Sequence, residues 1–205
     1  INAFKDGLDI HRATAAKVFG VDLDDVTRDM RSKAKAVNFG IAYGQGAFGL
    51  AQNLGISRGE AREIIDSYVK QFPGITKYKE SSIEMARKTG YAETIMGRRR
   101  YVPDINSKNH VVRSAAERNA INAPIQGSAA DVIKVAMINL QKALKEKGFK
   151  SKMLLQVHDE LVFDAHKSEV EEITPIIRKE MEKAHELIVP LVVDISTGNN
   201  WLEAH

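Results

Sequence analysis

Helix start and stop signals follow one another closely through residues 1–90 of this sequence. Asp9 can cap a helix that Gly20 would end, because short polar side chains bond free N–H groups and glycine allows a left-handed turn. Ser57 and Glu60 have the spacing of a capping box in front of an apolar helical face. Signals at this density predict that the first part of the chain folds as a set of packed helices.

Further helices are predicted on both sides of an irregular segment. Asp24 or Asp25 opens a helix that runs to about Tyr43, and Pro73-Gly74 separates the two helices that follow. Residues 91–105 are expected to be extended or looped. The next predicted helices span residues 107–122 and 128–147, and Pro124 is expected to interrupt the helical conformation between them.

The last part of the chain alternates between strand and helix. The apolar runs Lys152–Val157 and Leu161–Phe163 predict an antiparallel hairpin. A helix is predicted at residues 169–187, and the β-branched run Leu191–Ile195 predicts another strand. The fold class is therefore α+β, with a mostly helical part followed by a part that contains a small antiparallel sheet. We place the boundary between the two parts near residue 108.

Composition excludes several classes of protein. Hydrophobic residues make up 43% and charged residues 28% of the chain, as in globular domains. No run of about 18 apolar residues is present, so no membrane-spanning segment is predicted. The absence of cysteine excludes disulfides and thiolate metal sites, and fits a reducing cytoplasm. The net charge of +3 is weakly indicative of an anionic partner.

Four residues form a stripe on the helix predicted to end near residue 43. Arg31, Lys35, Phe39 and Tyr43 recur at four-residue intervals and share one helical face. The two cations precede the two aromatic rings, and the N-terminal end of a helix favours anions. A nucleoside triphosphate has the same order, with phosphates at one end and a flat base at the other. The stripe indicates a triphosphate site, although an amphipathic helix with a solvated basic turn and buried aromatic rings has the same spacing.

Acidic residues lie at the predicted turn between the two hairpin strands. His158, Asp159 and Glu160 occupy this turn, where buried strands would fix the carboxylates in space. Paired Mg²⁺ ions that catalyse phosphoryl transfer are bound by carboxylate and phosphate oxygens. Acidic residues are also common in exposed turns, so a metal site and an ordinary turn are both consistent with this pattern.

Polar side chains at four-residue spacing mark another helix. Arg118, Asn122 and Gln126 are donors that can reach the acceptors present in the minor groove of every base pair. An ordinary polar helix face has the same appearance. The three consecutive arginines at residues 98–100 suit either DNA phosphate contacts or structural ion pairs.

Several segments resemble the family A DNA polymerases of bacteria, in that family's order and spacing. RSKAKAVNFGIAYG at residues 31–44 resembles motif B, and QVHDELVF at residues 156–163 resembles motif C. DIHRATA at residues 9–15 and AAERNAINAPIQGSAAD at residues 115–131 also match the family. The resemblance implies a DNA-directed DNA polymerase, with a fingers subdomain at residues 1–108 and part of a palm subdomain at residues 109–205.

The same resemblance implies roles for individual residues. The incoming deoxynucleoside triphosphate would be held by His11, Arg31, Lys35, Phe39 and Tyr43, with Arg31 and Lys35 also assisting catalysis. Asp159 would bind Mg²⁺, with Glu160 as an accessory catalytic carboxylate. The implied contacts with template-primer DNA are made by Arg118, Asn122, Gln126 and His158. A bacterial enzyme of this kind is expected in the cytoplasm, with no membrane partner.

One departure from the family pattern limits these expectations. The family's motif A, which supplies the other metal-binding aspartate, lies upstream of Asp9 and is not in this sequence. The isolated 205-residue chain is therefore expected not to polymerise DNA, and to self-associate through apolar surface. The alternative function for such a chain is a non-catalytic DNA-binding module.

Overall fold

A computed structural model describes residues 1–204, apart from the side chains of Ala3 and Gln71. The chain forms two compact units. The N-terminal unit contains residues 2–125, and the C-terminal unit contains Ile1 and the residues from 126 onward. The α+β fold class is confirmed, because the helices are accompanied by two small antiparallel sheets.

The units divide within a long helix at residues 125 and 126, whereas the sequence places a boundary near residue 108. Residue 108 lies in the short connection that precedes this helix. The units are defined by packing within this chain, which does not test a division into fingers and palm. The assignment of residues 1–108 and 109–205 to those subdomains therefore stays a prediction.

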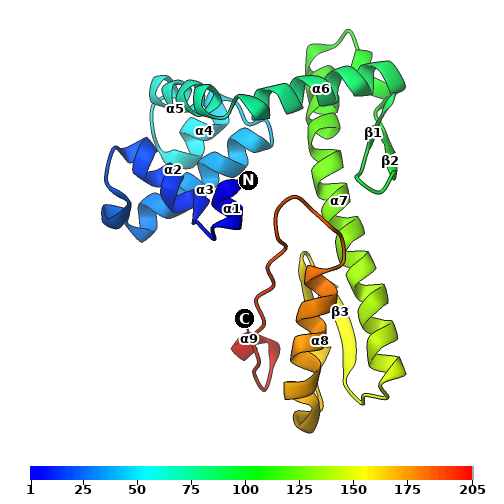
Figure 1. Cartoon of the computed structure of the whole chain (residues 1–205). Coiled ribbons are helices and arrows are strands. Elements are labelled where there is room, and N and C mark those ends of the chain that lie inside the picture. The colour runs from blue at the N-terminus through cyan, green and yellow to red at the C-terminus, as the bar shows by residue number, and fades with distance from the viewer. Residues whose placement is uncertain (205) are drawn as a thin grey trace. The chain divides into compact units, whose positions relative to one another are not determined.

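The N-terminal unit is mostly helical (Figure 1). Its elements are α1 (Asn2–Lys5), α2 (Ile10–Phe19), the 3₁₀ helix η1 (Leu23–Asp25), α3 (Arg28–Ala42), α4 (Ala47–Leu54), α5 (Arg58–Gln71), α6 (Pro73–Thr89), β1 (Tyr91–Glu93), β2 (Arg99–Tyr101), η2 (Pro103–Asn106) and the first part of α7 (His110–Glu146). The two strands pair antiparallel, with Tyr91 opposite Tyr101.

Local capping explains where the first helices begin and end. The side chain of Asp9 accepts hydrogen bonds from the backbone N–H groups of His11 and Arg12, and Gly20 ends α2 with a left-handed φ of 66°. Both were predicted, as was the capping box at the start of α5. The predicted start of the helix that runs to about Tyr43 was wrong. Thr27 caps α3, because Asp24 and Asp25 form the separate 3₁₀ turn η1.

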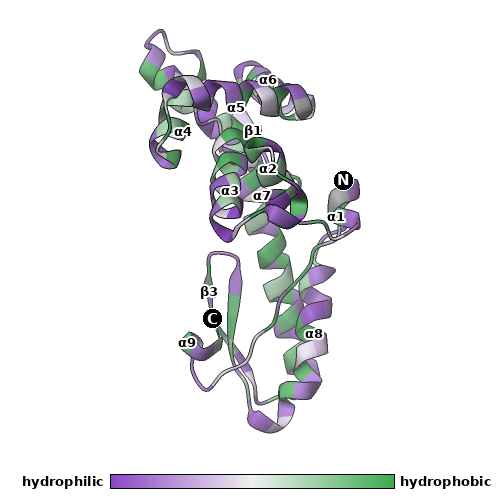
Figure 2. Cartoon of the chain, turned by 90° about the vertical axis from the view of Figure 1, so that its left-hand side faces the viewer, coloured by the Kyte–Doolittle hydropathy of each residue, from purple (hydrophilic) through white to green (hydrophobic). Residues whose placement is uncertain are grey.

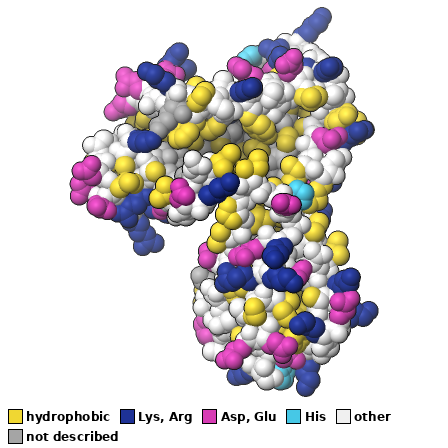
Figure 3. All heavy atoms as spheres, viewed as in Figure 1, with side chains coloured by type: hydrophobic (Ala, Val, Ile, Leu, Met, Phe, Trp, Pro, Cys, Tyr) yellow, Lys and Arg dark blue, Asp and Glu magenta, His cyan; other side chains and the backbone are white. Residues whose placement is uncertain are grey.

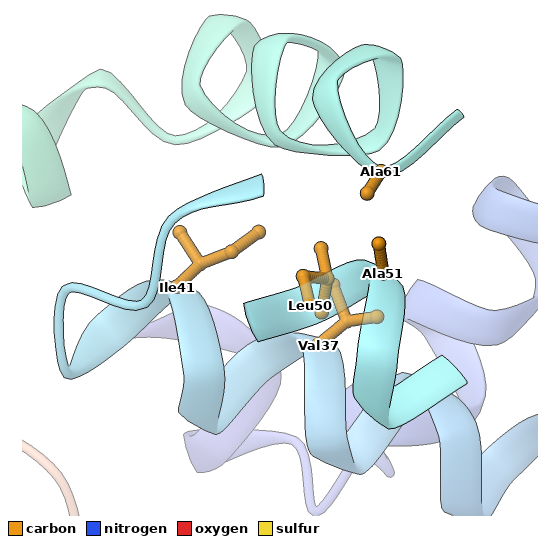
Figure 4. Packing of buried hydrophobic residues seen from close by; sticks show 5 residues of the cluster. All are labelled: Val37, Ile41, Leu50, Ala51 and Ala61. Atoms are coloured by element: carbon orange, nitrogen blue, oxygen red, sulfur yellow. The ribbon is translucent and has the colours of Figure 1, made fainter. Parts of the chain in front are cut away.

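A compact apolar cluster holds α3 in place. Val37 and Ile41 of α3 pack with Leu50 and Ala51 of α4 and with Ala61 of α5 (Figure 4). All five side chains are buried. Val37 and Ile41 form the apolar face of α3, which packs on α4 and α5. The basic and aromatic stripe lies on another face of α3 and is therefore largely exposed.

The helix α7 runs through Pro124 without a break. The sequence predicts an interruption there, because proline lacks the N–H that would bond four residues back and costs about 3 kcal/mol in a helix. Buried residues on both sides of the proline offset this cost. They include Ala120 and Ile121 before it and Ile133 and Ala136 after it.

The C-terminal unit contains the end of α7, the hairpin β3 (Lys152–Val157) and β4 (Glu160–Asp164), η3 (Lys167–Glu169), α8 (Val170–Glu182) and α9 (Trp201–Ala204). Leu140 and Leu144 of α7 form its buried core with Ile173 and Ile177 of α8. Phe163 of β4 packs against this cluster. Figure 2 shows that hydrophobic and hydrophilic residues are interspersed along α8, as burial of one face of a helix requires.

The strand predicted at Leu191–Ile195 does not form. Side chains of α8 bind its backbone instead. Arg178 donates to the carbonyl oxygen of Val193, and the N–H of Val193 donates to the carboxylate of Glu182 at 3.3 Å. Since these bonds occupy backbone groups that a strand partner would need, the β-branched run stays irregular.

Glu169 anchors the segment that leads into β3. Its carboxylate accepts hydrogen bonds from the backbone N–H groups of Lys150 and Ser151, at 3.0 and 2.9 Å, and from the Ser151 hydroxyl at 2.7 Å. The hydroxyl bond from Ser151, followed by the backbone bond from Lys150, lowers the pKa of Glu169 to about 2. The ionised form of Glu169 is therefore the form that these three hydrogen bonds stabilise.

The substitution Glu169→Gln should destabilise the C-terminal unit in a pH-dependent way. Because the folded pKa lies below the ordinary value of 4.5, the carboxylate stabilises the fold above that pH, and this contribution is lost as the pH falls toward about 2. In thermal denaturation, the midpoint temperature of Glu169→Gln should thus be lower than that of the unsubstituted chain at neutral pH, and the two should be equal near pH 2. Glu172→Gln, at an exposed position of α8, is the control. A difference that persisted near pH 2 would contradict this role.

No helix within residues 1–204 is both long enough and apolar enough to cross a membrane.

Candidate nucleotide and DNA site

The helices α2 and α3 bring together all five residues predicted to hold a nucleotide. Phe39 and Tyr43 lie parallel, with ring centroids 6.1 Å apart and planes at 8°. His11 of α2 lies 5.7 Å from the Phe39 ring, and Lys35 Nζ lies 6.0 Å from the same ring. The Phe39 side chain is 45% exposed. An aromatic ring that is exposed beside cations fits a ligand site and not the alternative of buried core aromatics.

Arg31 is held by the residue that caps α2. Its Nε lies 2.5 Å from the Oδ2 atom of Asp9. Burial alone would raise the pKa of Asp9, but the hydrogen bonds from Arg31 and from the backbone N–H of Arg12 lower it. The ion pair holds the Arg31 guanidinium at the N-terminal end of the stripe. Sequence reasoning identified Asp9 as a cap and missed this pairing, which joins residues 22 positions apart.

His11 is bonded to a buried asparagine. The Nδ2 atom of Asn38 lies 2.9 Å from His11 Nδ1, and Thr14 Oγ1 lies 3.1 Å from Asn38 Oδ1. Burial, followed by the charge of Arg31, lowers the pKa of His11, and Lys35 adds to this effect against the opposing effect of Asp9. Sequence reasoning did not assign a role to Asn38. A polar residue between the buried positions of Val37 and Ile41 was the available signal.

The end of α3 approaches the DNA-binding candidates on α7. A Cβ atom on Gly44, whose φ is +80°, would lie 3.9 Å from Arg118 Cγ and 4.0 Å from Ile121 Cδ1. Arg118 is exposed, and the Oδ1 atom of Asn122 is buried without a hydrogen-bond partner among the described residues. Gln126 is exposed one turn further along α7 and belongs to the C-terminal unit.

The arginine cluster at residues 98–100 is at least partly structural. Arg99 pairs with Glu93 at 2.9 Å, and its guanidinium lies 4.5 Å from the centre of the Tyr91 ring. Arg100 Nη2 lies 3.4 Å from Asn119 Oδ1. These contacts favour the ion-pair interpretation for Arg99 over a free phosphate contact.

The hairpin β3–β4 carries Asp159, the predicted metal ligand, at its turn, whereas Glu160, which was predicted to lie in the turn, begins β4. Val157 and Glu160 are paired, so His158 and Asp159 form a two-residue turn. His158 has a φ of +53°, as the first position of the favoured hairpin turns requires. Gln156 Nε2 donates to the His158 carbonyl oxygen at 2.8 Å, a brace that sequence reasoning missed. His158 and Asp159 are exposed and Glu160 is partly buried.

The two acidic side chains of Asp159 and Glu160 are fewer than a self-sufficient metal site needs. Within residues 1–204, no group of three or more histidine, aspartate or glutamate side chains is arranged to hold a metal ion. Any ion bound at Asp159 and Glu160 would depend on oxygen ligands from water or from a substrate.

Comparison with known proteins identifies the family. The family model for DNA polymerase family A matches residues 1–203. This chain belongs to DNA polymerase family A. DNA polymerase I of Lactococcus lactis subsp. lactis (strain IL1403) is 54% identical over 205 residues, which are 100% of this chain and 23% of the relative. DNA polymerase I of Bacillus subtilis (strain 168) is 52% identical over 204 residues, with 100% and 23% covered.

A solved family A structure has the same fold. The structure described as the POL domain of Pol1 from M. smegmatis, in complex with DNA primer-template and dNTP, matches with a TM-score of 0.95 and 47% sequence identity. The match covers 99% of this chain and 36% of that chain. This family A chain thus spans about a quarter of the length of the curated relatives that it matches.

Proposed function

We propose that this chain supplies the nucleotide-binding and DNA-binding part of a DNA-directed DNA polymerase, which adds deoxynucleotides to a primer in replication and repair. One observation carries the proposal: His11, Arg31, Lys35, Phe39 and Tyr43 meet on the surface of α2 and α3 in the order of a triphosphate, with phosphate-binding groups at one end and rings at the other. The solved relative, described as bound to DNA primer-template and dNTP, supports the same assignment.

Each side chain has a task in this proposal. Arg31, already oriented by Asp9, presents its guanidinium to phosphate oxygens. Lys35 adds a positive charge and can protonate the pyrophosphate that leaves. Phe39 and Tyr43 stack beside the sugar and base, a contact that accepts all four bases because each has a π-face.

The hairpin turn is proposed to contribute the metal ligands. Asp159 and Glu160 suit Mg²⁺, because this ion takes one or two protein carboxylates and completes its shell with water and substrate phosphates. Bound Mg²⁺ would neutralise the charge that develops on the phosphates. The chain contributes a fixed position for these carboxylates, through the hairpin and the hydrogen bond from Gln156 to the His158 carbonyl oxygen.

Template-primer DNA is the proposed second partner. Arg118 and Asn122 lie on α7 near the end of α3, and Gln126 continues their spacing. The amide N–H groups of Asn122 are donors that suit the acceptors of a base edge. His158 at the hairpin turn is the proposed contact for the primer end.

A non-catalytic DNA-binding module is the alternative. Such a module would need the donors on α7 but not an exposed Phe39 between Lys35 and Tyr43. The organisation of α3 therefore favours the polymerase. Self-association of this chain and a cytoplasmic location stay predictions. Hydrophobic side chains do reach the surface among charged ones on the face shown in Figure 3, as self-association would require.

Binding of a deoxynucleoside triphosphate tests the proposal. The 205-residue chain should bind dATP with Mg²⁺, and Lys35→Ala should weaken the affinity by roughly 10–100-fold, because one charge-assisted contact to phosphate is lost. Isothermal titration measures both. Asp159→Ala, in the C-terminal unit, should change the affinity much less. Equal affinities for the unsubstituted chain and Lys35→Ala, or no binding by either, would contradict the proposed role of α3.

A further inference from the structure

Two buried polar side chains connect α2 to α3 beside the nucleotide stripe. Asn38 is only 8% exposed, and its amide lies between Thr14 and His11. The Asn38 Nδ2 atom lies 2.9 Å from His11 Nδ1, and the Asn38 Oδ1 atom lies 3.1 Å from Thr14 Oγ1. An amide nitrogen can only donate, so His11 Nδ1 must accept. A neutral imidazole that accepts at Nδ1 carries its hydrogen on Nε2.

We propose that Asn38 is a positioning residue that fixes His11 in the tautomer with its hydrogen on Nε2, so that neutral His11 donates a hydrogen bond to a phosphate oxygen. The inference rests on the proposed function, because it takes the phosphates to lie beside His11 and Arg31. It adds what that function leaves open, namely how an uncharged histidine binds an anion.

The surroundings of His11 make the tautomer decisive. Burial, Arg31 and Lys35 lower the pKa of His11, with Asp9 acting in the opposite direction, and this favours the neutral ring. A neutral ring has a single N–H. With the hydrogen on Nδ1, Nε2 would present a lone pair that repels phosphate oxygens, whereas the Nε2–H tautomer attracts them.

The hydroxyl of Thr14 contacts the oxygen of the Asn38 amide. It has one hydrogen, and it lies 3.1 Å from Asn38 Oδ1 and 2.8 Å from the Ile10 carbonyl oxygen. Because Oδ1 faces this hydroxyl, the amide nitrogen faces His11. The reversed amide would accept from His11 Nδ1–H and produce the opposite tautomer. The two orientations of the Asn38 amide therefore differ in whether the hydrogen of neutral His11 lies on Nε2 or on Nδ1.

Nitrogen NMR on the ¹⁵N-histidine-labelled chain distinguishes the two tautomers. His11 signals are assigned by their loss in His11→Gln. We expect an unprotonated Nδ1 and a protonated Nε2 in neutral His11. In Asn38→Asp, a carboxylate of similar size can only accept, so the hydrogen should move to Nδ1 and the pKa of His11 should rise. Asn53→Asp, at an exposed position of α4, is the matched control and should leave both unchanged.

Affinity for dATP with Mg²⁺ supplies a second readout. For Asn38→Asp, the affinity for dATP should fall on the order of tenfold at a pH where His11 is neutral. The affinity should recover as the pH falls through the raised pKa of His11, because imidazolium donates from both nitrogens. A merely structural role of Asn38 would lower affinity equally at every pH. A hydrogen on Nδ1 in the unsubstituted chain overturns the proposal, even if Asn38→Asp does not fold. The expected tautomers without dATP binding would instead overturn the proposed function and, with it, the phosphate contact.

Discussion

Replacing Leu50 with alanine should lower the free energy of unfolding of the N-terminal unit by about 2–5 kcal/mol, because the lost apolar contacts are joined by the cost of a cavity. The Leu50 side chain is 0% exposed and packs with Val37 and Ile41 of α3. Two of the five buried residues in the cluster are alanines, whose side chains are too short to fill the space that Leu50 leaves (Figure 4). Hydrogen exchange of the α3 and α4 amides measures the effect.

Phe48→Ala is the matched control for this prediction. Phe48 lies on α4, two residues before Leu50, but is 64% exposed. Its removal deletes more carbon atoms than Leu50→Ala and should still change stability by less than about 1 kcal/mol, because little burial is lost. A larger loss for Phe48→Ala than for Leu50→Ala would show that the core of this unit lies elsewhere. Loosening α3 should also weaken dATP binding, since its cluster orients the stripe.

Leu140→Ala is expected to have a comparable effect on the C-terminal unit, again about 2–5 kcal/mol. Leu140 of α7 is 0% exposed and packs with Ile173 and Ile177 of α8. Phe163 of β4 rests on the same cluster, so the hairpin that carries Asp159 should lose protection together with α8. Hydrogen exchange of the β3 and β4 amides is the direct measurement.

Ile138→Ala controls for the deletion of a large side chain from the same helix. Ile138 is 69% exposed and should tolerate the change within about 1 kcal/mol. Leu50→Ala and Leu140→Ala also test the division into two units. Each substitution should reduce protection mainly in its own unit, because each unit has its own buried cluster. Equal loss across both units after either substitution would show that the chain unfolds as one cooperative body.

The sequence by itself determined those features that depend on neighbours a few residues away. Asp9 and Ser57 cap their helices with bonds that span two or three residues, so their types and spacing were sufficient. The stripe from Arg31 to Tyr43 follows from helical periodicity alone. The hairpin likewise follows from two apolar runs and a short polar gap between them, although Glu160, predicted to lie in the turn, is part of β4.

The tertiary structure decided whatever depends on residues far apart in the chain. Pro124 lies inside a continuous helix because buried residues on both sides outweigh its local cost, and Leu191–Ile195 forms no strand because α8 binds its backbone. Arg31 is oriented by Asp9, and His11 by Asn38 from 27 positions away. Side-chain type and spacing predict which groups would bind a triphosphate. Only the packing of α2 against α3 decides how those groups are oriented, because their contacts join residues that are far apart in the sequence.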